Sequence, residues 1–127
     1  MWIATKIGFF SIVEKEHHEN PNGQKLFVVR ARDSGDLHRL ILLIKNKIKK
    51  EPTIYSYDKS DYPHRIYLET KEDFEATLAA LTQTVTYPNF KDEILETDHQ
   101  RDKVQPYSDL WLGLLLSHNK GEFGGIF

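Results

Sequence analysis

The sequence has no cysteine, which excludes disulfide bonds, thiolate catalysis and cysteine-bound metals. It also has no apolar run near twenty residues in length, so we expect no segment that spans a membrane. The first residues lack a basic segment followed by an apolar core, and a cytoplasmic protein without a signal peptide is predicted. Seventeen basic and nineteen acidic side chains leave a formal charge of −2, so attraction to a polyanion would need a local basic patch.

Motifs for catalysis and cofactors are missing as well. The seven glycines form neither a dinucleotide-binding fingerprint nor a P-loop, and no His-Glu-x-x-His pattern occurs. Asp98, His99 and Asp102, with Asp61, are the residues from which a metal-dependent nuclease or hydrolase would be built. Charged runs of this kind are more typical of solvated segments. We therefore predict no catalytic residue, no metal site and no cofactor.

The stretch 26–48 carries the clearest structural signal. Residues 26–32 alternate between two faces, as side chains on a strand do, with Phe27, Val29 and Ala31 on the apolar face. Asp33 or Ser34 is placed to cap a helix that follows directly. The helix is predicted from apolar residues at three- and four-residue spacing, which are Leu37, Leu40, Ile41, Ile44 and Ile48.

The same plan, a hairpin followed by a helix, occurs twice. A long first strand over 2–15 and a turn at Asn20-Pro21-Asn22-Gly23 precede the strand 26–32. Strands over 53–57 and 64–69 precede a second helix, which Thr70 caps. We thus expect one α+β domain divided into a first ββα unit (1–50), a second ββα unit (51–86), a C-terminal helical segment (87–118) and a tail (119–127). The predicted architecture is a two-layer sandwich, in which a four-stranded antiparallel sheet has both helices on one face and the C-terminal helices against an edge or the other face.

The face of the sheet away from the helices is the candidate site. If Lys15 lies opposite Lys25, then Phe10 lies opposite Arg30, although a shift of one residue would reverse the two faces. Arginines bind phosphate through paired hydrogen bonds, and aromatic rings stack on bases. The predicted ligand-binding residues are Lys6, Phe10, Arg30, Arg32, Arg65 and Tyr67.

Two interpretations of these residues stay open. In the first, the chain is a non-catalytic binding module for an anionic ligand, either a nucleotide or a nucleic-acid backbone. In the second, the arginines are structural, paired with Glu69 or another carboxylate, and the protein is an interaction or homodimerisation domain. The second interpretation relies on the apolar C-terminal helix with Trp111, Leu114 and Leu115. Neither involves a membrane.

Several motifs also resemble a family of small, uncharacterised bacterial proteins. They are Thr5-Lys-Ile-Gly-Phe-Phe-Ser11, Val29-Arg-Ala-Arg32, Asp61-Tyr62 with Arg65, Tyr87-Pro-Asn-Phe-Lys91 and Gln100-Arg-Asp-Lys103. The resemblance covers the chain from residue 2 to about residue 111. It implies no activity.

Overall fold

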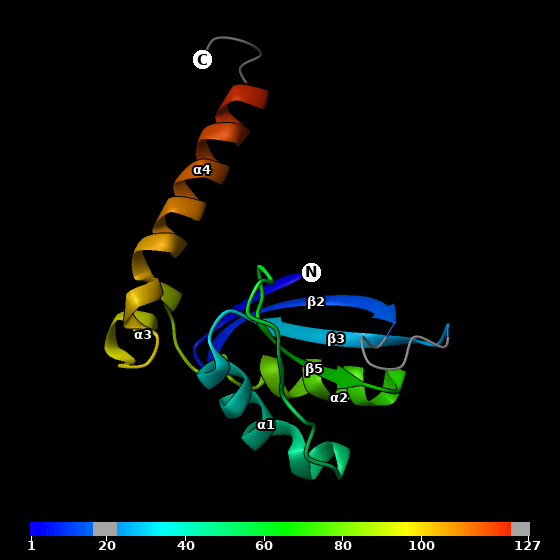
Figure 1. Cartoon of the computed structure of the whole chain (residues 1–127). Helices are drawn as coiled ribbons and strands as arrows, with labels where there is room; N and C mark the ends of the chain where they lie inside the picture. The colour runs from blue at the N-terminus through cyan, green and yellow to red at the C-terminus, as the bar shows by residue number, and fades with distance from the viewer. Residues whose placement is uncertain (17–22, 123–127) are drawn as a thin grey trace. The chain divides into compact units, whose positions relative to one another are not determined.

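The structure is a computed structural model that describes residues 1–16 and 23–122 (Figure 1). It divides into two compact units, Met1–Thr86 and Tyr87–Phe127, and each is described by itself. The chain is mixed α and β with an antiparallel sheet, as predicted. Most of the turn expected at 20–23, and residues 123–127 of the expected tail, lie outside the described residues.

The first unit contains a five-stranded antiparallel sheet in the order β1-β2-β3-β5-β4. Its strands are β1 (Trp2–Thr5), β2 (Gly8–Glu16), β3 (Lys25–Ala31), β4 (Tyr55–Ser56) and β5 (His64–Leu68). The prediction of four strands was wrong because a turn at Lys6 and Ile7 divides the expected first strand into a hairpin. The Thr5 hydroxyl oxygen accepts hydrogen bonds from the backbone N–H groups of Ile7 and Gly8, at 3.2 and 3.1 Å, and thereby stabilises this turn.

Helices α1 (Ser34–Ile48) and α2 (Lys71–Thr82) lie on the same face of the sheet (Figure 1). The predicted caps are confirmed: Asp33 accepts from the backbone N–H of Gly35 at 2.9 Å, and Thr70 accepts from that of Asp73 at 3.1 Å. All five residues of the predicted α1 stripe are buried. They pack against apolar side chains of the sheet and of α2, namely Phe10, Ile12, Val29, Ala31, Ile66, Leu68, Ala80 and Leu81.

The pairing of β2 with β3 differs by one residue from the prediction. Ser11, and not Phe10, lies opposite Arg30, and Glu16 lies opposite Lys25. The observed register pairs opposite charges, whereas the predicted one placed Lys15 against Lys25, and like charges directly opposite each other are destabilising. Because side chains alternate along a strand, the shift moves Phe10 to the helix-covered face, where it is fully buried in the core.

The second unit consists of α3 (Phe90–Glu96), a 3₁₀ turn η1 (Arg101–Lys103) and α4 (Val104–Glu122). Asn89 caps α3, accepting from the backbone N–H of Asp92 at 3.0 Å. Pro106 lies in the first turn of α4, where its missing N–H costs no helical hydrogen bond. The helix continues past the expected end at residue 118. The prediction that these helices pack against the sheet stays a prediction.

Candidate functional site

A row of side chains crosses all five strands on the face of the sheet away from α1 and α2. Arg30 lies directly opposite Ser11 on one side and Arg65 on the other. Ser11 in turn lies opposite Trp2, and Arg65 opposite Tyr55. Directly opposed residues in a sheet share a face. The row therefore brings two arginines side by side, with an aromatic residue at each edge of the sheet.

The loop 57–63, which connects β4 to β5, covers the arginines with two tyrosine rings. The guanidinium carbons of Arg30 and Arg32 lie 4.8 and 4.9 Å from the centroid of the Tyr62 ring. That of Arg65 lies 5.0 Å from the centroid of the Tyr57 ring. Arg30, Arg32 and Arg65 thus form one group, which we call the arginine cluster. Such cation–π contacts contribute roughly 0.5–2 kcal/mol each but leave the positive charge in place.

The hydrogen bonds of the arginine cluster all go to neutral oxygens. Arg30 donates to the Ser11 hydroxyl at 2.7 Å, and Arg32 donates to the backbone carbonyl of Asp61 at 3.2 Å. Arg65 donates to the Ser60 hydroxyl at 3.0 Å and to the backbone carbonyl of Tyr62 at 3.3 Å. Within residues 1–16 and 23–122, none of the three arginines forms an ion pair with a carboxylate. The charge of the cluster is therefore not balanced by the described side chains.

Burial increases the electrostatic cost of this arrangement. Arg65 is only 7% exposed, and the Nε atoms of Arg30 and Arg65 are buried donors without a hydrogen-bond acceptor among the described residues. The pKa of Lys15 is lowered, chiefly by burial and then by the positive charges of Arg65 and Arg30. Four cationic side chains thus influence one part of the sheet face. Like charges without counter-ions normally destabilise a fold, and such unfavourable arrangements concentrate at functional sites.

The structure brings together the three predicted arginines but separates other predicted residues. Lys6 lies in the β1–β2 turn and donates to the Thr86 hydroxyl at 2.6 Å, and Phe10 lies in the core. Tyr67 lies on the predicted face. Its ring is edge-on to that of Tyr55, with the ring centroids 5.5 Å apart.

Sequence reasoning missed Lys15, Tyr62 and Trp2. The alternation of side chains along β2 already restricted Lys15 to one of two faces. The correct β2–β3 register would have placed it on the same face as Arg30. Tyr62 belongs to a turn, and the path of a turn cannot be predicted from sequence periodicity.

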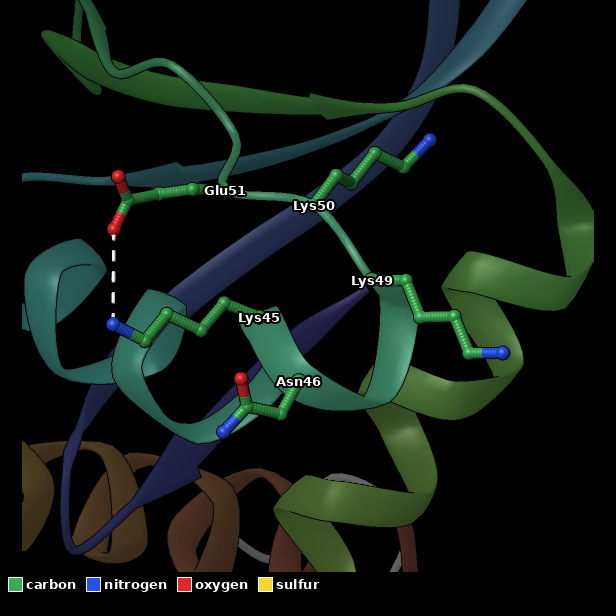
Figure 2. Close-up of a pocket in the computed structure, with 5 residues that line it drawn as sticks. All are labelled: Lys45, Asn46, Lys49, Lys50 and Glu51. Carbon is green, nitrogen blue, oxygen red and sulfur yellow. Dashed lines mark ion pairs between the residues drawn. The ribbon is translucent and has the colours of Figure 1, made fainter.

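A second basic region lies at the C-terminal end of α1, in a shallow hollow (Figure 2). Two of its lysines are paired with carboxylates, Lys45 with Glu51 at 3.9 Å and Lys50 with Asp73 at 2.7 Å. The hydrogen bond from Lys50 to Asp73 raises the pKa of Lys50. Figure 2 shows that the side chains of Lys45, Lys49 and Lys50 extend in different directions. This hollow does not direct several cations at one ligand.

The remaining sequence candidates give no comparable site. In the part of the chain that the structure describes, no three His, Asp or Glu side chains gather as metal ligands would. Asp98 pairs with Arg101 at 2.8 Å. Among the described helices, none is both long enough and apolar enough to cross a bilayer. In the comparisons with known proteins, no family model, curated protein or solved structure matches this chain.

Proposed function

We propose that the first unit is a non-catalytic binding module for an anionic ligand, and that the arginine cluster is its site. One observation supports the proposal above all: three guanidinium groups share a partly buried face without a carboxylate partner among the described residues. A bound anion would supply the missing negative charge. The ligand class is a phosphate-bearing molecule, either a nucleotide or a nucleic-acid backbone.

The three arginines have different roles in this proposal. Arg32 is exposed and Arg30 is half-buried, so their guanidinium groups are the ones that reach a ligand. Each can present two parallel N–H donors to a phosphate, which a lysine cannot do. Arg65 is buried beneath the 57–63 loop and already donates to two of its oxygens. It contributes positive potential and holds the loop in place.

Phosphate should stabilise the wild-type protein more than the same ionic strength of chloride does. At a phosphate concentration ten times the dissociation constant, we expect a stabilisation of about 1.4 kcal/mol, or roughly 3–6 °C in melting temperature. Arg30→Gln should lose most of this shift. Lys47→Gln is the matched control, because it removes one positive charge from an exposed position of α1 outside the cluster. Equal phosphate shifts in all three proteins would refute the proposed site.

The unliganded variants separate this proposal from a purely structural role of the arginines. If Arg30 were held in an internal ion pair, removing it would leave a buried carboxylate unpaired and lower the melting temperature sharply. Because Arg30 instead lies opposite Arg65, we expect Arg30→Gln to remain folded at low salt, with a melting temperature close to that of the wild type.

A second candidate function, self-association or binding of another protein, is favoured by α4. This helix exposes large apolar side chains around much of its circumference, which are Leu110, Trp111, Leu112, Leu114, Leu115 and Leu116. Exposed apolar surface of this extent is characteristic of interaction sites. The two functions belong to different units and are compatible. Anion binding should weaken as salt rises, whereas apolar association should persist or tighten.

A further inference from the structure

Trp2 lies on the same sheet face as the arginine cluster and is not explained by the fold. It belongs to the edge strand β1 and is 65% exposed, although tryptophan has one of the largest apolar surfaces of all side chains. Its ring is tilted at 59° against that of Phe9, with the centroids 6.1 Å apart. Phe9 is half-buried on the same face. The two rings form an aromatic surface that leaves much of the indole accessible.

The hydrogen bond between Arg30 and Ser11 sets the distance between this surface and the positive charge. Arg30 is on β3, two strands away from Trp2, and adjacent strands lie about 4.8 Å apart. However, Arg30 donates to the Ser11 hydroxyl at 2.7 Å, and Ser11 is the residue directly opposite Trp2. The guanidinium therefore leans toward β2 and contacts Ser11, which lies one strand spacing from Trp2. A phosphate at Arg30 would have an open aromatic ring beside it.

The other aromatic rings near the cluster are already engaged. The Tyr62 ring forms cation–π contacts with Arg30 and Arg32, and the Tyr57 ring forms one with Arg65. Tyr67 contacts Tyr55 edge-on. Tyr62 is also only 8% exposed. Of the aromatic side chains described on this face, Trp2 is thus the one with a large exposed area for stacking.

From this juxtaposition we infer that the anionic ligand is a mononucleotide, with its phosphate at Arg30 and Arg32 and its base stacked on Trp2. The inference rests on the proposed anion site and adds the ligand class and a further binding residue. Arginine supplies charge and paired donors to the phosphate, while the indole supplies a π-face that accepts any base. Recognition of the base by stacking alone predicts affinity for nucleotides with little preference among bases.

Tryptophan fluorescence gives a direct test. The chain has two tryptophans, so a Trp111→Phe background leaves Trp2 as the single reporter. Adenosine monophosphate should quench Trp2 fluorescence saturably and bind roughly tenfold more tightly than inorganic phosphate, which is the usual contribution of one stacked base. Trp2→Leu in the wild-type background should reduce adenosine monophosphate binding, measured by calorimetry, to the level of phosphate. The same substitution should leave phosphate binding unchanged.

The possible outcomes distinguish this inference from the proposal on which it rests. If phosphate and adenosine monophosphate bind equally, and Trp2→Leu affects neither, the anion site stands and base stacking is refuted. If neither ligand binds, and Arg30→Gln changes nothing, the anion site itself is refuted. A short single-stranded oligonucleotide that binds far more tightly than the mononucleotide would replace the mononucleotide with a nucleic acid and overturn the inference. Trp2→Phe is the conservative control and should retain part of the affinity difference.

Discussion

At the scale of single residues, Gly8 and Asp36 explain why the β1–β2 turn is fixed to α1. Asp36 is 1% exposed, accepts a hydrogen bond from the backbone N–H of Phe9 at 3.1 Å and forms an ion pair with Arg39. Arg39 also donates to the backbone carbonyl of Ile7 at 2.8 Å. A buried carboxylate is tolerated here because it is both paired and hydrogen-bonded. The pair positions Phe9, and through it the aromatic surface at Trp2.

Gly8→Ala should therefore destabilise the protein. A Cβ atom at this position would lie 2.5 Å from the Cβ and 2.6 Å from the Cγ of Asp36, so the turn and α1 would have to separate. We expect a loss of about 1–3 kcal/mol in the free energy of unfolding, measured by urea denaturation.

Gly113→Ala is the matched control for Gly8→Ala. A Cβ at Gly113 in α4 meets no atom within 4 Å, and alanine in a helix is favoured over glycine by roughly 0.5–1 kcal/mol. The control should leave stability unchanged or raise it. A Gly8→Ala protein as stable as the wild type would contradict the tight packing between the turn and Asp36.

At the scale of the elements, the sequence predicted helices better than strand pairing. The apolar stripe from Leu37 to Ile48 and the caps Asp33 and Thr70 were identifiable because helix periodicity and capping are local. The β2–β3 register depends on long-range packing, and an error of one residue in the prediction placed Phe10, rather than Ser11, opposite Arg30. The three arginines stayed grouped despite this error, because Arg30 and Arg32 belong to one strand face and Arg65 to the neighbouring strand. The covering position of Tyr62 is set by loop contacts that no sequence period encodes.

Helix α4 can be tested for self-association. If its exposed apolar side chains mediate self-association, the wild-type protein should form dimers in sedimentation experiments, and Leu114→Ser with Leu115→Ser should shift it to monomer. Leu42→Ser is the control, because Leu42 is 66% exposed on α1. The control should sediment as the wild type does. A wild-type protein that is monomeric at every concentration tested would contradict self-association through α4.

At the scale of the whole molecule, the net charge gives no indication of the arginine cluster. Nineteen acidic side chains outweigh seventeen basic ones, yet the face with Lys15 and the arginine cluster carries four cationic side chains. Overall attraction to anions is thus weak, and specific binding depends on local potential. A protein built in this way should discriminate against large polyanions more than a basic protein would.

Calorimetric titration of inorganic phosphate at several salt concentrations is the decisive test of the arginine cluster as an anion site. We expect a single site per chain, with an affinity that falls as sodium chloride rises from about 20 to about 200 mM, because salt screens the attraction. Arg30→Gln should weaken binding by about tenfold or more, as expected for one charge-assisted hydrogen-bonding group, while Lys47→Gln should not. The absence of a phosphate-binding signal at the lowest salt, or equal binding by Arg30→Gln and the wild type, would show that the arginine cluster is not an anion site.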